Sequence, residues 1–446
     1  MTLRAMLTLA RLRSALLPAA TWAWTRGVLM LYVYDVIPYI SHSDITGDVK
    51  LYNRWSTILS QGHFPQHDPT WQYPPGAAIV IELPRLVRSV TGLSYYSAFY
   101  GMALASDLII FLLVVYRCWR TAEQVGTERI EYLGAYAYVA AIFMVGPFAF
   151  GRYDIVVTMI ASLGLVIALS SAAATWRLRG VAIGFGAIVK VWPIALILGL
   201  PRGPQGRRAL VWTVLGGAVP TLSLLIMPGA LSFLGQQNDR GLEIESVLAT
   251  PFLLARRLGY HGVIRNRYGS WEIIGPGISE IASFCELLTL LGFCWLLWWR
   301  RRARLTPERW TEGVYYDAGL VAVMISIITS RVLSPQYLVW VCGLLALCLS
   351  LAPLKRGGTV LAGPCWLLLA TISVTQLEFP TLFAPLVHGS GKAALFVTGR
   401  NALLVGATVW AACLLWRRYT VPREQAVSCG DTRIEMRDAK ESLDPA

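Results

Sequence analysis

The chain has 446 residues, of which 55% are hydrophobic and only 15% charged, whereas a soluble protein carries about 25% charged residues. Apolar segments of about 20 residues recur along it, the length that an α-helix needs to cross a bilayer. We therefore predict an all-α polytopic integral membrane protein. A transmembrane β-barrel is excluded, because barrel strands alternate apolar and polar residues, whereas these segments are apolar throughout.

The net charge of +13 does not indicate nucleic-acid binding. The basic residues lie in short clusters between the apolar segments, which is the pattern of cytoplasmic loops in membrane proteins. No two of the eight cysteines have the Cys-x-x-Cys spacing. The sequence therefore predicts neither a disulfide framework nor a zinc site.

In chain order, the first apolar segment covers about 16–37 and follows three arginines, as in an uncleaved signal-anchor helix. We predict about ten to twelve transmembrane helices in total. The later ones are expected near 94–116, 130–150, 154–174, 180–199, 209–229, 278–299, 313–329, 337–353, 358–377 and 393–416.

The segment 180–199 does not fit a single crossing, because arginine clusters precede and follow it. Lys190 and Pro193 lie at its middle, and a proline there removes a helix hydrogen bond. We interpret it as a broken or re-entrant helical pair. Such irregular backbone is tolerated only against protein or a watery cavity.

This assignment makes residues 1–422 a single transmembrane domain with both termini in the cytoplasm. Two long loops, 40–94 and 230–277, then lie outside the cell. Residues 423–446 are polar with mixed charge and no periodicity, and they are predicted to form a disordered cytoplasmic tail.

The first long loop carries two close acids, Asp44 and Asp48, and a cluster of aromatic residues. Tyr52 and Trp55 follow Asp48 at helical spacing, which predicts a short amphipathic helix at the membrane surface. Asp48 is then either an ordinary acid at a helix N-terminus or a general base that deprotonates an acceptor hydroxyl. Residues 77–90, further along, are too short to span and are expected at the interface.

Polar strings also occur at three other boundaries of apolar segments. Residues 151–154 and 331–337 contain Arg152, Asp154 and Arg331, and both strings are equally compatible with ordinary helix caps. In the second long loop, arginines from Arg240 onward run against the charge rule for external loops. A lipid phosphate is a natural ligand for them. Arg400 falls within the last apolar segment, where a charge usually faces a cavity or a partner.

Metal and nucleotide chemistry have little support in the sequence. His42, His63 and His67 could hold a divalent ion together with Asp44, but their spacing matches no strong metal motif. No nucleotide-binding motif is present. We therefore expect no cofactor and no metal.

Several of these strings, taken in order, resemble glycosyltransferase family 87, the actinobacterial α-mannosyltransferase-like group of integral membrane enzymes with the GT-C fold. The matching positions are Asp48 to Tyr52, Gly62, 73–75 (YPP), 152–154 (RYD), 190–193 (KVWP), 240–246 (RGLEIES), 333–337 (LSPQY), 379–380 (FP) and Arg400–Asn401.

The resemblance implies a GT-C glycosyltransferase that uses a polyprenyl-phosphate sugar, with mannose expected, and a lipid-linked glycan or glycolipid acceptor on the extracytoplasmic face. It implies an acid of the first loop as catalytic base, with Asp48 at the matching position and Asp44 less secure. From charge and loop position we expect the donor phosphate and lipid to contact Arg331, Arg240, Lys190, His388, Gln336 and Tyr337. The sugar or acceptor is expected to contact Tyr52, Tyr73, Trp71, His67, Glu245, Arg152 and Asp154.

Two other functions remain open at this stage. One is a secondary transporter or lipid flippase, which the polytopic pattern and the break near Lys190 and Pro193 would suit. The other is a related transferase that uses polyprenyl-phosphate arabinofuranose.

Overall fold

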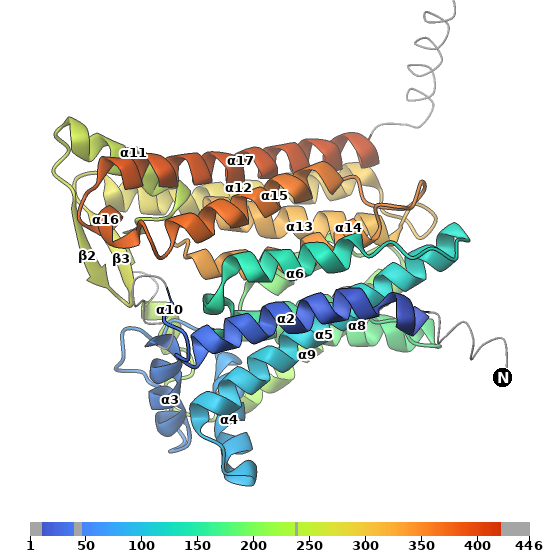
Figure 1. The fold of residues 1–446 in the computed structure, drawn as a ribbon, viewed down its shortest axis with the longest axis horizontal. Helices are drawn as coiled ribbons and strands as arrows, with labels where there is room; N and C mark the ends of the chain where they lie inside the picture. Colours follow the sequence, from blue (N-terminus) through green and yellow to red (C-terminus); the bar gives the residue numbers. More distant parts are fainter. Residues whose placement is uncertain (1–10, 40–46, 237–239, 421–446) are drawn as a thin grey trace, which may run out of the picture.

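The computed structural model describes residues 11–39, 47–236 and 240–420. Its long helices run side by side as one bundle (Figure 1). Their bounds are α2 Leu16–Val33, α5 Tyr95–Val125, α6 Leu133–Val145, α7 Asp154–Val166, α8 Ala172–Val189, α9 Pro204–Leu224, α12 Ile278–Ala303, α13 Glu312–Thr329, α14 Val339–Ser350, α15 Ala362–Glu378 and α17 Gly391–Thr420. Asp44 and His42, and the proposed tail 423–446, lie outside the described residues.

The shorter elements gather mostly at one end of the bundle, away from the first described residues and the end of α17 (Figure 1). The α-helical ones are α3 Gly47–Leu59, α4 Ala77–Thr91, α10 Ser232–Gln236, α11 Thr250–Ala255 and α16 Phe383–Val387. Single turns of 3-10 helix are η2 Pro147–Phe150, η4 Val247–Ala249, η5 Arg256–Leu258 and η6 Pro335–Leu338, and a longer one is η3 Trp192–Gly199. Both predicted long loops therefore meet at this end.

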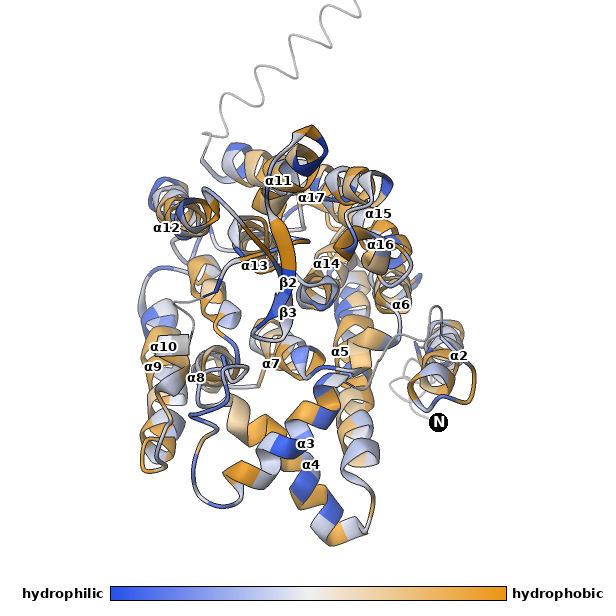
Figure 2. Cartoon of the chain, turned by 90° about the vertical axis from the view of Figure 1, so that its left-hand side faces the viewer, coloured by the Kyte–Doolittle hydropathy of each residue, from blue (hydrophilic) through white to orange (hydrophobic). Residues whose placement is uncertain are grey.

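The prediction of a helical polytopic membrane protein is confirmed. Among the described residues, α5, α12, α13 and α17 are each long and apolar enough to cross a membrane. Many residues along the long helices are hydrophobic (Figure 2). The total number of crossings, and which face of the membrane each end occupies, remain predictions.

The predicted break in segment 180–199 is present, although the helix starts earlier than expected. Helix α8 begins at Ala172 and ends at Val189, and Lys190 adopts an extended conformation. Segment η3 then begins at Trp192, with Pro193 in its first turn. The break therefore places Lys190 at a point where the backbone leaves the helix.

Glycines let α8 approach α9 at backbone distance. A Cβ atom added to Gly180 would lie 2.2 Å from the carbonyl oxygen of Ala209, and one added to Gly184 would lie 2.0 Å from that of Thr213. Small residues commonly bring membrane helices this close together. This contact fixes the helix whose C-terminal end carries Lys190.

A buried ion pair joins the first helix to the bundle. The Arg26 guanidinium of α2 donates two 2.9 Å hydrogen bonds to the Asp107 carboxylate of α5. Tyr138 and Trp22 also donate to that carboxylate, each at 2.7 Å. The pair therefore has a structural role, because it links α2 to α5.

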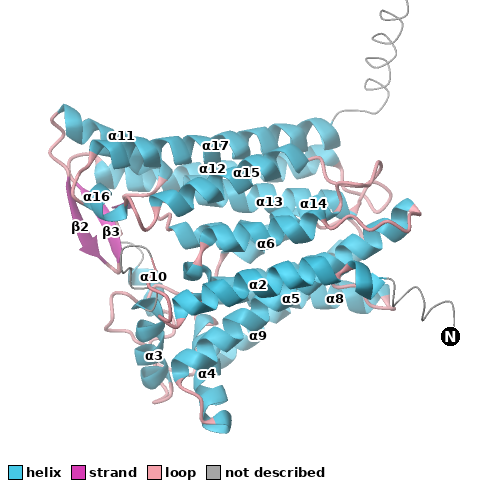
Figure 3. Ribbon diagram, viewed as in Figure 1, coloured by secondary structure: helices cyan, strands magenta, loops and turns pink. Residues whose placement is uncertain are grey.

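The second long loop contains a small antiparallel sheet, which the all-helical prediction missed (Figure 3). Strands β1 Leu242–Glu243, β2 Val263–Arg267 and β3 Ser270–Ile274 lie in the order β1-β3-β2. Tyr268 and Gly269 connect β2 to β3, and both have positive φ, as two-residue hairpin turns of this kind require.

The predicted surface helix exists as α3, with Asp48 in its first turn. However, the expectation that Tyr52 and Trp55 lie at the membrane interface is wrong, because both side chains are fully buried. They pack in a cluster of aromatic rings with Tyr73 and Trp71. The amphipathic pattern reflects burial against protein, and a sequence cannot distinguish protein from lipid as the apolar environment.

Candidate active site

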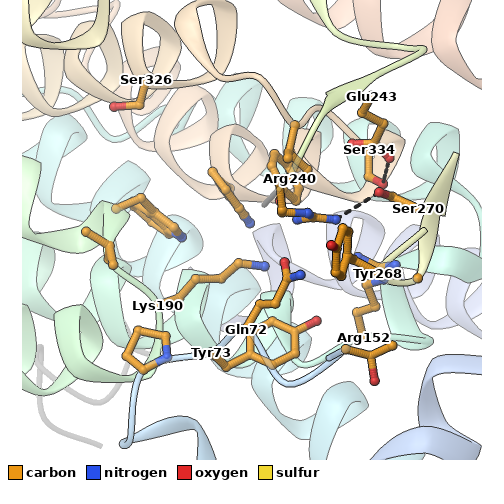
Figure 4. Close-up of a pocket in the computed structure, with 18 of the residues that line it drawn as sticks. Gln72, Tyr73, Arg152, Lys190, Arg240, Glu243, Tyr268, Ser270, Ser326 and Ser334 are labelled. Carbon is orange, nitrogen blue, oxygen red and sulfur yellow. Dashed lines mark hydrogen bonds between the residues drawn. The ribbon is translucent and has the colours of Figure 1, made fainter. Parts of the chain in front are cut away.

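A cavity of about 370 Å³ lies where the two long loops meet the bundle. Its wall comes from segments far apart in the sequence, and Figure 4 shows several of its side chains. The polar and charged groups on it include Asp48, Gln72, Tyr73, Arg152, Lys190, Arg240, Glu243, Ser270, Ser334 and Tyr337. A cavity of this size that combines aromatic walls with convergent polar groups is typical of a ligand site.

Asp48 forms an ion pair on the cavity wall. The Nε atom of Arg152 donates to its Oδ2 atom at 2.5 Å, and the Asp48 side chain remains 31% exposed. Burial acts to lower the pKa of Arg152, but Asp48 together with Tyr73, Tyr52 and Asp154 outweighs it, so the pKa lies well above its ordinary value. Arg152 therefore stays charged and orients the carboxylate, which remains accessible from the cavity.

Lys190 is held between a carboxylate and a box of aromatic rings. Its Nζ atom lies 2.5 Å from Oδ1 of Asp154, the first residue of α7, and Trp340 donates a hydrogen bond to the same oxygen. The Nζ atom lies 4.9–6.0 Å from the ring centres of Tyr73, Tyr153, Tyr337 and Trp340. These rings interact favourably with the cation and fix its position on the wall.

Arg240 provides a third cation, which the sheet supports. It donates a 2.9 Å hydrogen bond to Ser270 and lies 3.6 Å from the buried carboxylate of Glu272. Glu272 also accepts a hydrogen bond from the backbone of Gly241. Figure 4 shows Arg240 reaching toward Ser270 at the upper part of the cavity.

Glu243, on β1, is the second carboxylate of the cavity wall. Its Oε1 atom accepts a 3.0 Å hydrogen bond from Ser334, and its backbone N–H donates to the carbonyl of Arg331. The side chain is only 4% exposed. Burial raises its pKa above the ordinary value, although Arg240 and Ser334 oppose that effect.

The structure brings some of the predicted site residues to the cavity and leaves others away from it. Those on its wall are Asp48, Tyr73, Arg152, Lys190, Arg240 and Tyr337. Those buried or half-buried nearby, but not on the wall, are Tyr52, Trp71, Asp154, Arg331, Gln336 and Glu245.

Two expected contacts lie outside the cavity. His67 and His388 are exposed, and a ring nitrogen of His388 is 2.7 Å from the carbonyl of Ala384. The turn 151–154 also differs from a simple Arg/Asp cap. Arg152 and Asp154 bind Asp48 and Lys190 respectively, so this turn links two other segments.

Sequence reasoning missed several wall residues, some of which lie within the strings that it selected. Glu243 lies in the same string as Glu245, but β1 turns Glu243 to the cavity while Glu245 contacts Arg400. Ser334 and Trp192 belong to the strings LSPQY and KVWP. Gln72 precedes the YPP string. Tyr268, Ser270 and Ser326 also line the cavity but lie in none of the selected strings.

Within the described residues, no group of three or more His, Cys, Asp or Glu side chains could hold a metal ion. The expectation that no metal takes part remains a prediction. Lys190, Arg152 and Arg240 are the cavity's cations.

Comparison with known proteins places these features in a family. The sequence model of glycosyltransferase family 87 matches residues 71–326, a segment that includes the three cations but begins after Asp48. The structure is similar to the crystal structure of ArnT from Cupriavidus metallidurans bound to undecaprenyl phosphate, with a TM-score of 0.41 and 12% identity, over 88% of this chain and 77% of that one. No curated protein sequence matches the chain.

Proposed function

Because this chain belongs to glycosyltransferase family 87 and is a membrane glycosyltransferase, we propose that it transfers a sugar, with mannose expected, from polyprenyl phosphate to a lipid-linked acceptor outside the cell. The observation that carries the proposal is the cavity wall, on which one accessible carboxylate and three cations converge. A transfer from a lipid phosphate needs both kinds of group.

Asp48 is the base in this proposal. It accepts the proton of the acceptor hydroxyl while that oxygen attacks the anomeric carbon. The bond from that carbon to the phosphate oxygen breaks, and the lipid phosphate leaves with the electron pair. Direct attack inverts the configuration, so a β-linked donor yields an α-linked product.

The leaving phosphate requires positive charge where its own negative charge develops. Lys190 and Arg240 are the cavity's candidates, because Arg152 is bound to Asp48, the proposed base, whereas the carboxylates beside Lys190 and Arg240 take no part in the proposed reaction. Both are held in place before the substrate arrives, Lys190 by Asp154 and Arg240 by Ser270. Preorganised charges of this kind stabilise a transition state without reorganisation.

The direct test replaces Asp48 with asparagine and measures transfer from a radiolabelled lipid-phosphate sugar to a membrane acceptor. Removing a general base slows transfer by about 10²–10⁴-fold. Asp35→Asn is the matched control, since Asp35 is exposed at a positive-φ position that asparagine tolerates. Near-normal turnover in well-folded Asp48→Asn would remove Asp48 as the base.

The identity of the sugar needs a separate measurement. Unlabelled polyprenyl-phosphate mannose and polyprenyl-phosphate arabinofuranose would compete with the labelled donor in the wild-type protein. We expect mannose to compete, and competition by arabinofuranose alone would replace the mannose assignment.

A further inference from the structure

Glu243 is a buried carboxylate that the proposed chemistry does not use. Its Oε1 atom accepts from Ser334 at 3.0 Å, whereas its Oε2 atom is buried and has no hydrogen-bond partner among the described residues. Both side chains line the cavity. Figure 4 shows Glu243 and Ser334 at the upper edge of the cavity, with Arg152 and Tyr73 at the lower one.

No cation in the described part of the chain forms an ion pair with this carboxylate. Arg240 is near, but its guanidinium contacts Glu272 and Ser270. A buried carboxylate oxygen without a hydrogen-bond partner is costly, and in a residue on a cavity wall a bound ligand can supply the missing contact. The Oε2 atom of Glu243 is therefore an unsatisfied acceptor that a hydrogen-bond donor of a ligand can satisfy.

The chemistry of the wall indicates which donor that is. A phosphate would be repelled by the carboxylate, and Lys190 and Arg240 are the cavity cations that suit it. Hydroxyl groups fit, because each donates one hydrogen bond and accepts others. The Ser334 hydroxyl lies beside the carboxylate, so a ring with neighbouring hydroxyls could contact both side chains.

We propose that Glu243 and Ser334 form the subsite that recognises the transferred sugar, with the free oxygen of Glu243 accepting a hydrogen bond from one ring hydroxyl. This inference rests on the proposed function and names the part of the substrate that the β1 side of the cavity binds. It makes Glu243 a specificity-determining residue, because a donor lacking that hydroxyl leaves the carboxylate unpaired.

The test compares short-chain lipid-phosphate donors that each lack one ring hydroxyl, using the wild-type protein and Glu243→Gln. In the wild type we expect one of them to lose about 10- to 100-fold in kcat/KM, as for a hydrogen bond to a charged group. In Glu243→Gln the parent donor should lose a similar factor, mainly through KM. In Glu243→Gln, the kcat/KM of that same deoxy donor should be little lower than that of the parent donor, because the hydrogen bond is already lost.

Glu245→Gln is the matched control, because Glu245 is two residues further on, equally buried, and absent from the cavity wall. We expect it to keep the wild-type preference among the deoxy donors. Ser334→Ala provides a second probe if Glu243→Gln does not fold, and it should weaken the same preference.

Three outcomes would overturn part of the reasoning. If every deoxy donor loses the same factor in Glu243→Gln or Ser334→Ala as in the wild type, the subsite is wrong while the proposed function stands. If Glu245→Gln loses the preference among the deoxy donors to the same extent, the effect arises from the strand as a whole, and the subsite is wrong as well. If the wild type transfers from no lipid-phosphate sugar, the proposed function itself fails.

Discussion

The contact between α8 and α9 supports a sharp prediction about Gly184. Replacing Gly184 with alanine should destabilise the protein and also impair transfer, because α8 ends one residue before Lys190. The new Cβ atom would lie 2.0 Å from the carbonyl oxygen of Thr213. Ordinary contact begins at 3.4 Å, so the two helices must separate by roughly 1.4 Å at this point.

The magnitude follows from two opposing effects. Alanine gains about 1 kcal/mol over glycine in a helix interior. Overpacking a tight contact costs about 1–3 kcal/mol or more, and the upper end applies here because the obstructing atoms belong to the backbone of α9. We therefore expect a net loss of about 1–2 kcal/mol.

The assay is thermal unfolding of the purified protein in detergent, together with the KM for the lipid donor. Gly101→Ala is the matched control, since Gly101 lies inside α5 and a Cβ there would have no neighbour within 4 Å. We expect that variant to be as stable as the wild type or more stable. If Gly184→Ala behaves like Gly101→Ala in both measurements, the close contact does not position Lys190.

Three further predictions concern charged groups. Lys190→Met should raise the KM for the lipid donor at least tenfold, because it removes a cation from the cavity wall, and an unchanged KM would exclude Lys190 from phosphate binding. Arg26→Met should lower the free energy of unfolding by about 3–5 kcal/mol, because it leaves Asp107 buried without its ion-pair partner. Adding Asp107→Asn should recover much of the lost melting temperature. If the losses of the two single variants simply add in the double variant, this reasoning is contradicted. Burial acts to raise the pKa of Asp68, but hydrogen bonds from Thr70 and Trp55 outweigh it, so the pKa lies below its ordinary 3.8. A group with a lowered pKa stabilises the fold above the unfolded value and loses that effect as the pH falls through the folded one. The stability deficit of Asp68→Asn should thus be constant near neutral pH and shrink only below about pH 3.8, and a deficit that persists at lower pH would refute the shift.

The membrane class, most helices and the break at Lys190 could be predicted from the sequence, because apolar length and a central proline act locally. Helix boundaries were less accurate. The expected segment 154–174 ends as α7 at Val166, and α8 begins at Ala172, because Ser171 caps a new helix within a continuous polar-poor stretch. The small sheet was missed because β1 is only two residues long and forms by pairing with a distant hairpin.

The candidate site was predictable as a set of strings but not as a set of contacts. Arg152 and Asp154 are neighbours in the sequence, yet they bind Asp48 and Lys190 in different directions. The choice between Glu243 and Glu245 depends on how β1 pairs with β3, which no local pattern determines. Long-range pairing of this kind is a property of the folded bundle.

The ion pairs also have a consequence for the growing chain during its synthesis. Arg26 precedes Asp107 by 81 residues, and Asp48 precedes Arg152 by 104. During synthesis, Arg26 and Asp48 therefore lack their ion-pair partners until whole helices have been added after them. A nascent chain that stops before Val332 lacks part of the cavity wall, so the cavity is complete only after most of the bundle has been synthesised.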